Sequence, residues 1–276
     1  MRSSSNPAFR KLPVGNAGYG QYGPNVGFNQ PQGGVPGYGT PQAPSGADDR
    51  PMTVDDVVIK TGMSLGVALI TGIVTAIWSQ GQVAAGNMGA VMGAMLVGML
   101  VGLGLSLFII FKQKASGPLT LAYSAVEGVF LGAITGVFQY YFGTGIALQA
   151  LVGTAAVFGT MLVVYKTGAV KVTPKLTKWI IGALGGVLVL MLANLVLGMF
   201  GVDMGLRSGG PIAIIFSLVV IGIAAFSFLL DFDQADRMIR EGMPAKWAWF
   251  AAFGLMTTLV WLYLEILRLL SYLQSD

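Results

Sequence analysis

Long runs of apolar residues recur along the chain from residue 60 onward, separated by short polar or basic stretches. A helix rises about 1.5 Å per residue, so about 20 apolar residues are needed to cross the hydrocarbon core of a bilayer. Seven runs reach this length, and they predict seven transmembrane helices. The predicted spans cover residues 60–79, 88–111, 119–142, 146–165, 177–200, 211–230 and 254–273.

The seventh apolar run is about 30 residues long, which is more than one untilted span requires. A single tilted helix fits this length. We favour a division into two parts, because Trp and Lys gather at the level of the lipid headgroups. Lys246, Trp247 and Trp249 then form an interfacial segment, which is followed by the span 254–273.

The chain before the first span has two parts. Residues 1–50 are rich in Gly, Pro, Gln, Asn and Tyr and lack a periodic apolar pattern, so they are predicted to be a disordered arm without a signal peptide. In the segment TVDDVVIK that follows, Thr53 fits a helix N-cap, and Asp55 and Asp56 lie where the helix dipole favours acids. The expected domains are the arm, 1–50, and a transmembrane domain, 51–276.

Glycines recur at four-residue intervals in two of the predicted spans. Gly128, Gly132 and Gly136 form one such stripe, and Gly98 with Gly102 repeats the spacing. Small residues let membrane helices approach closely, so these stripes predict tight helix packing. None of these glycines belongs to a phosphate-binding loop, and nucleotide binding therefore has no support.

Composition agrees with a membrane protein and excludes several kinds of site. Hydrophobic residues make up 54% of the chain and charged residues only 10%, whereas soluble domains contain roughly 25% charged residues. With no Cys and no His, the chain cannot form a disulfide, a thiolate nucleophile, a Ser-His-Asp triad or an imidazole metal site.

Basic residues are concentrated in the connections that follow the even-numbered spans. The odd-numbered connections have almost none, and Arg207 is the exception. The positive-inside rule therefore places the basic loops and the arm in the cytoplasm, and an odd number of spans places the C-terminus on the other side. If the seventh segment re-enters instead, the C-terminus is cytoplasmic. The basic residues behind the net charge of +4 thus set the membrane topology, and the charge does not indicate nucleic-acid binding. The basic residues concerned are Lys112, Lys114, Lys166, Lys171, Lys175, Arg237, Arg240 and Lys246.

Ionisable residues inside membrane spans are costly, and each is a candidate functional residue. On a helix Asp231 and Asp233 project about 200° apart, so only one can point into the bundle. Asp233 has a structural alternative as a surface ion pair with Arg237, and Glu265 has one with Arg268. The candidates are Glu127, Asp231, Asp233, Glu265 and Arg268.

The functional hypothesis is that Asp233 and Glu265 approach each other between the sixth and seventh helices and share a proton. Two carboxylates that share a site titrate as a pair, with one proton held well above the usual acidic range. Loss of that proton makes the two charges repel, which supplies the two-state element of a gate. Such a switch needs no histidine.

The segments SFLLDFDQ in the sixth span and LYLEILRLL in the seventh resemble the two signature segments of the Bax inhibitor-1 family, also called the transmembrane Bax inhibitor motif family. Aligned by Phe226 and Ser227, Asp233 falls on the sixth-helix acid of the family and Glu265 on the seventh-helix acid. The opening MRSSSNPAFRKL and the segment TVDDVVIK resemble a bacterial branch with an extended arm. The resemblance covers about residues 50 to 273.

The resemblance implies an all-α integral membrane protein of the bacterial plasma membrane, with seven transmembrane helices and a central seventh helix. It also implies a pH-sensitive calcium leak with the two acids as sensor, and a role in ion homeostasis and in suppressing stress or cell death. Some bacterial members instead restrain a membrane-bound protease. This chain has Glu265 where the family has Asp, and Arg268 favours the ionised form of that acid. Asp231 adds a second acid to the sixth-helix site.

The few acids favour a leak over a calcium store. Ca²⁺ takes six to eight oxygen ligands, so Asp233 and Glu265 would bind it weakly, as conduction requires. Glu127 either lines the same path or is a neutral, hydrogen-bonded side chain. The expected partners are lipid, Ca²⁺ and protons, with no cofactor and no nucleic acid. The alternative is a non-enzymatic modulator of a membrane protease. An aspartyl protease ranks low, because Tyr-Leu-Glu stands where such enzymes have Gly-x-Gly-Asp.

Overall fold

The computed structural model of the protein describes residues 49–202 and 204–275, so the predicted arm lies almost entirely outside the described residues. Within these residues seven α-helices follow one another, and all seven are long and apolar enough to cross a membrane, which confirms the predicted fold class. A short 3₁₀ turn, η2, precedes the seventh helix. The elements are α1 (Val54–Ala84), α2 (Met88–Lys112), α3 (Gly117–Phe142), α4 (Gly145–Thr167), α5 (Pro174–Met199), α6 (Gly210–Arg240), η2 (Ala245–Trp247) and α7 (Ala248–Leu273).

Helices α1, α6 and α7 extend well beyond the predicted spans. α6 continues for ten residues past residue 230, because no Gly or Pro interrupts this segment and two i,i+4 ion pairs support its last turns. Gly242, with a φ of 67°, and Pro244 end the helical path. The expected division of the seventh segment is wrong in its extent: only Ala245–Trp247 form a separate turn, and α7 already begins at Ala248.

The start of α1 follows the predicted pattern. Thr53 is the N-cap, and its hydroxyl accepts a hydrogen bond from the Asp56 backbone N–H at 3.3 Å. The Asp56 carboxylate in turn accepts the Thr53 backbone N–H at 2.9 Å, which completes a capping box. Arg50 donates to both oxygens of Asp56, at 2.8 and 2.6 Å. The first turn of α1 is therefore tied to the segment that precedes it.

The glycine stripe of α3 lies directly against α1, as predicted. A Cβ atom added to Gly132 would overlap with the carbonyl oxygen of Gly72, and one added to Gly136 would lie 2.5 Å from the carbonyl oxygen of Ala76. The Ser79 hydroxyl donates across the same interface to the Ala133 carbonyl at 2.8 Å. The two backbones therefore approach each other so closely that no side chain fits between them.

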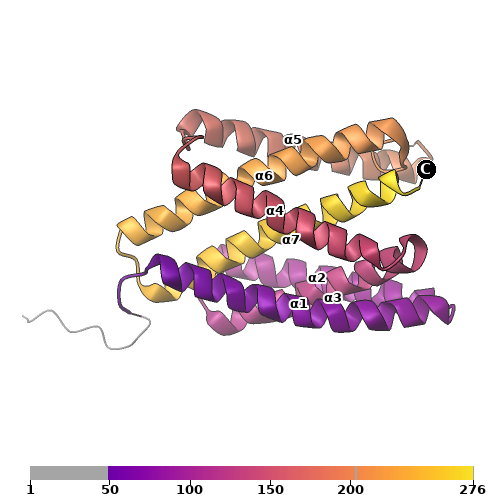
Figure 1. Ribbon diagram of the computed structural model, residues 1–276, viewed down its shortest axis with the longest axis horizontal. Coiled ribbons are helices and arrows are strands. Elements are labelled where there is room, and N and C mark those ends of the chain that lie inside the picture. The colour runs from indigo at the N-terminus through magenta and orange to yellow at the C-terminus, as the bar shows by residue number, and fades with distance from the viewer. Residues whose placement is uncertain (1–48, 203, 276) are drawn as a thin grey trace, which may run out of the picture. The chain divides into compact units, whose positions relative to one another are not determined.

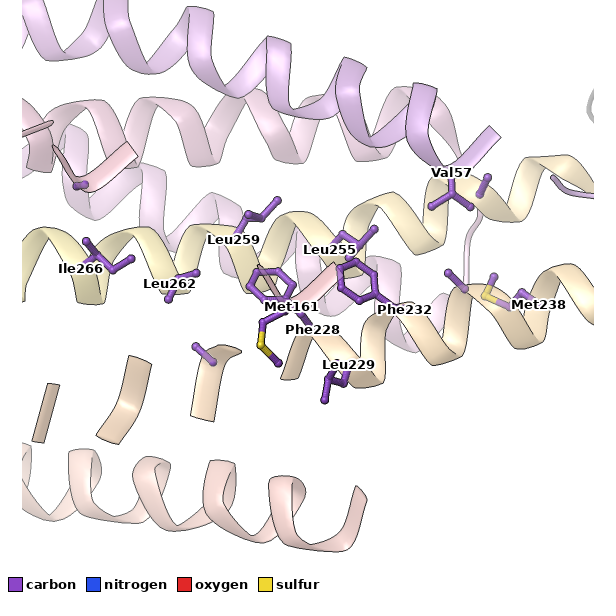
Figure 2. Packing of buried hydrophobic residues seen from close by; sticks show 14 of the residues in the cluster. Val57, Met161, Phe228, Leu229, Phe232, Met238, Leu255, Leu259, Leu262 and Ile266 are labelled. Atoms are coloured by element: carbon purple, nitrogen blue, oxygen red, sulfur yellow. The ribbon is translucent and has the colours of Figure 1, made fainter. Parts of the chain in front are cut away.

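The seventh helix is central, as expected. In Figure 1 α7 passes between the pair formed by α1 and α3 and the pair formed by α4 and α6, and it contacts all four helices. Figure 2 shows Phe228 and Phe232 of α6 beside Leu255 and Leu259 of α7, with Met161 of α4 in the same cluster. By contrast, α5 packs mainly against α6. α7 therefore has neighbouring helices on most of its surface. Polar side chains on this helix can be sheltered from lipid by those neighbours.

A short segment before α1, residues 49–52, is bound to the connection between α6 and α7, and we call it the N-terminal strap. The Met52 N–H donates to the Met243 carbonyl at 2.8 Å, and the Ala245 N–H donates to the Arg50 carbonyl at 2.7 Å. The Lys60 ammonium group donates to the Ala245 carbonyl at 2.7 Å. Met52 itself is buried. The root of the arm and the α6–α7 connection are therefore one packed unit.

Candidate functional site

Polar side chains lie along α7 inside the bundle. Thr258 and Glu265 are seven residues apart, which is close to two helical turns, so they lie on one face of the helix about 10 Å apart. Most of the surrounding α7 residues are buried and apolar. This face of α7 is therefore the place where the chain holds acids away from lipid.

Asp231 is the sixth-helix acid that faces α7. The Thr258 hydroxyl donates to its Oδ2 atom at 2.6 Å. Asp233, about 200° around the helix, instead forms an ion pair with Arg237 at 2.6 Å, and the Arg237 side chain is 60% exposed. Asp233 thus forms the ion pair with Arg237 that was its structural alternative, although its own side chain is only 17% exposed.

The structure does not bring Asp233 and Glu265 together. The alignment by Phe226 and Ser227 selected Asp233 as the acid of the sixth helix. The rotation of α6 about its own axis instead turns Asp231, two residues earlier, toward Thr258 of α7. The inward position belongs to Asp231, which the sequence left as the rival candidate. Thr258, its partner, was not predicted, since a threonine in a membrane span is unremarkable until its neighbour across the interface is known.

Glu265 lies between two arginines. The residue is only 2% exposed, and its Oε1 atom accepts from Arg268 at 3.0 Å and from Arg207 at 3.1 Å. The Arg268 contact was the predicted alternative for this acid. The Oε2 atom is buried and accepts no well-formed hydrogen bond. The Trp261 indole, four residues earlier on α7, lies near this carboxylate.

Arg207 was missed as a site residue, although it is the one basic residue in the odd-numbered connections of the sequence. It precedes α6, and its carbonyl oxygen accepts from the Tyr272 hydroxyl of α7 at 3.2 Å. Its Nε atom contacts the Met191 sulfur of α5 at 3.0 Å. The α5–α6 connection thereby carries a guanidinium from outside the helices to the Glu265 carboxylate.

Glu127 belongs to a different part of the bundle. Its Oε1 atom lies against Gly102 of α2, where an added Cβ would be 2.9 Å away. It also neighbours the Tyr123 hydroxyl, which is 3.3 Å from the Thr257 hydroxyl of α7. Thr257 is about 100° around α7 from Thr258, so these contacts lead away from the face that holds Asp231.

Within residues 49–202 and 204–275, no three His, Cys, Asp or Glu side chains are grouped as a metal site. The candidate acids are instead spread along the bundle, with Asp231 of α6 beside α7, Glu265 on α7 itself and Glu127 of α3 beside α2. Each carboxylate can offer at most two oxygens to a cation. A Ca²⁺ ion at either position would therefore take most of its six to eight ligands from water or from backbone carbonyls.

Within the described residues, seven apolar helices, of which the central one holds the buried Glu265, define a multi-pass integral membrane protein. The family model described as Bax inhibitor 1 like matches residues 6–275, nearly the whole chain, and the protein belongs to this family. An uncharacterized protein of Chlamydia muridarum (strain MoPn / Nigg) is 32% identical over 162 residues, which cover 56% of this chain and 68% of that relative.

Proposed function

We propose that this protein is a non-catalytic cation leak, with Ca²⁺ as the principal ion, and that Asp231 and Glu265 are the stations along its path. The observation that supports this function best is the burial of Glu265, at 2% exposure, on the α7 face that also meets Asp231 through Thr258. An acid inside a membrane bundle is costly, and it marks an ion or proton pathway more often than a structural site. The arm faces the cytoplasm and the membrane is the plasma membrane in this proposal.

The spacing of the two acids suits conduction. Thr258, the partner of Asp231, lies about 10 Å from Glu265 along α7, whereas Ca²⁺ binds oxygens at about 2.3–2.6 Å, so we treat the two acids as separate sites. Each would bind the ion weakly by itself, and weak, multiple sites let an ion leave as readily as it enters. A cation would therefore move between two separate stations.

Proton sensitivity, in this proposal, belongs to Asp231 and not to a pair that shares a proton. The Thr258 hydroxyl donates to Asp231 at 2.6 Å, a contact that stabilises the ionised carboxylate. Protonation removes the charge that attracts the cation, and it turns one carboxyl oxygen into a donor. The station then loses its attraction for the cation.

Replacement of Asp231 by Asn is expected to reduce the leak, whereas replacement of Asp233 by Asn is not. Calcium flux into liposomes that contain the purified protein would be measured for both variants and the wild type across about pH 5 to 8. Loss of a charge close to the path should lower flux by about fivefold or more and flatten its pH dependence. Asp233→Asn is the matched control, since it removes the same charge from the ion pair with Arg237 and leaves the contact between Asp231 and Thr258 in place. Equal flux and equal pH dependence in the two variants would exclude Asp231 as a station.

A second function, restraint of a membrane-bound protease or another membrane complex, is favoured by the N-terminal strap. Residues 49–52 bind the α6–α7 connection through backbone hydrogen bonds of 2.7 and 2.8 Å. A partner that holds the arm would therefore pull directly on the connection between the two helices that hold Asp231 and Thr258. The arm would be a regulatory handle on the same helices.

Deletion of residues 1–48 is expected to leave the leak unchanged and to abolish any interaction made through the arm. The deletion stops before Asp49 because Arg50 pairs with Asp56 and the strap stabilises the start of α1. Liposome flux and cross-linking to a co-expressed membrane protease would be measured for the full chain and for the truncated chain. Loss of flux on truncation would contradict a leak formed by the helices alone, and retention of a cross-link would contradict binding through the arm.

A further inference from the structure

We propose that Arg207 is a tethered cation that closes the Glu265 station and that opens it by moving to Asn194. This inference rests on the proposed cation leak. It concerns the regulation of the same site by a residue of the α5–α6 connection.

The charge around Glu265 is the first observation. Arg207 and Arg268 donate to the same oxygen, Oε1, at 3.1 and 3.0 Å. One carboxylate with two guanidinium groups has a local charge of about +1, and unit charges at such distances interact strongly away from bulk water. A cation that approaches this cluster is repelled. The arrangement therefore represents a closed station, and one arginine has to leave before Glu265 can attract an ion.

Of the two arginines, Arg207 is the one able to leave. Arg268 lies on α7 three residues from Glu265, so its backbone is fixed beside the carboxylate. Arg207 lies in the connection before α6, which contains Gly201, Gly205 and Gly209 at φ values of 79°, 73° and 92°. Glycines in the left-handed region can absorb the backbone changes of a hinge. The connection can therefore move while the α7 backbone remains in place.

A second position for the Arg207 guanidinium is already formed. An open cavity of about 400 Å³ is lined by Arg207, Asn194 and Ser208, with glycines at positions 198 and 201. The Asn194 Oδ1 atom is buried and accepts no hydrogen bond. An unsatisfied buried acceptor is costly, and a guanidinium is a strong donor to it. Movement of Arg207 toward Asn194 would satisfy this oxygen and at the same time release Glu265.

Flux measurements test the closing role of Arg207. Arg207→Gln removes the tethered charge and should raise calcium flux into liposomes by about fivefold or more. Asn194→Leu removes the acceptor of the open position and should lower flux below that of the wild type. Arg240→Gln makes the same change in net charge at an exposed ion pair with Asp236, so it serves as the control and should leave flux unchanged. If Arg207→Gln conducts no better than Arg240→Gln while the wild type conducts, the proposal is overturned.

A distance measurement separates this inference from the proposed function. The chain has no Cys, so spin labels on Ser208→Cys and Gln274→Cys, both exposed positions, report on the connection relative to α7. Two distance populations are expected in the full chain. Arg207→Gln should remove the shorter one, and Asn194→Leu the longer one. A single population, unaltered by Asn194→Leu, would overturn the switch even if Arg207→Gln failed to fold. Two populations without flux in any variant would support the switch and refute the cation leak.

Discussion

Gly132→Leu is expected to separate α1 from α3 and to leave little folded protein in detergent. Even a Cβ atom at this position would overlap with the Gly72 carbonyl oxygen, and it would lie 2.8 Å from the Thr75 Cβ. Both obstacles belong to a neighbouring helix backbone or lie next to it, so they cannot rotate away. Overpacking typically costs about 1–3 kcal/mol, and the cost here should reach the upper part of that range. The midpoint of thermal unfolding and the yield of monodisperse protein would measure the effect.

Gly93→Leu is the matched control for this substitution. Gly93 lies within α2, and an added Cβ there would meet no atom within 4 Å. Both substitutions replace glycine by leucine inside an apolar helix, so they share the gain in helix propensity and the gain in apolar surface. Equal unfolding midpoints for the two variants would show that the close contact of α1 and α3 does not limit stability.

Glu265→Gln is expected both to destabilise the protein and to lower its calcium flux. Removal of the carboxylate charge leaves Arg207 and Arg268 without their shared partner, and each arginine side chain is little more than a quarter exposed. Loss of one member of a buried ion pair costs about 3–5 kcal/mol, and partial exposure of the arginines favours the lower end. The station would also become more positive, so the leak should fall. Unfolding midpoints in detergent and liposome flux would be recorded on the same preparations.

The double variant Arg207→Gln with Glu265→Gln tests whether the cost arises from the ion pair. Its unfolding midpoint should lie above that of Glu265→Gln alone, because one of the two unpaired arginines is removed. Asp233→Asn, which breaks an i,i+4 pair whose arginine is 60% exposed, should lower the midpoint less than Glu265→Gln does. If the double variant were as unstable as the sum of the two single changes, Arg207 and Glu265 would not be coupled.

The features of this fold that depend on composition and local pattern could be read from the sequence. Apolar length indicated seven spans, the TVDDVVIK segment indicated the cap at Thr53, and the four-residue spacing of Gly128, Gly132 and Gly136 indicated a close helix contact. Each signal lies within one element, where backbone geometry alone sets the outcome. The structure agrees at all three places.

The features that depend on the rotation of one helix against another could not be predicted. Asp231 and Asp233 differ by two residues, and the choice between them depends on the rotational phase of α6 against α7. The contact between Arg207 and Glu265 joins residues 58 positions apart through an irregular connection. No periodic pattern encodes the path of such a connection. The sequence therefore suggested Glu265 as a candidate but not the arginine that reaches it from the α5–α6 connection.

The central place of α7 has a consequence for biogenesis. α7 follows α1, α3, α4 and α6 in chain order, so these helices enter the membrane before the partner they all contact. Lys60 and Ala245, joined by a hydrogen bond, are 185 residues apart, and at about 5–20 residues per second the ribosome needs on the order of 10–40 s to make that stretch. Until α7 is made, the surfaces of these helices that will contact it are covered by lipid or by insertion machinery. Quality control in the membrane thus has a defined intermediate to recognise, with the face that will receive Glu265 still exposed.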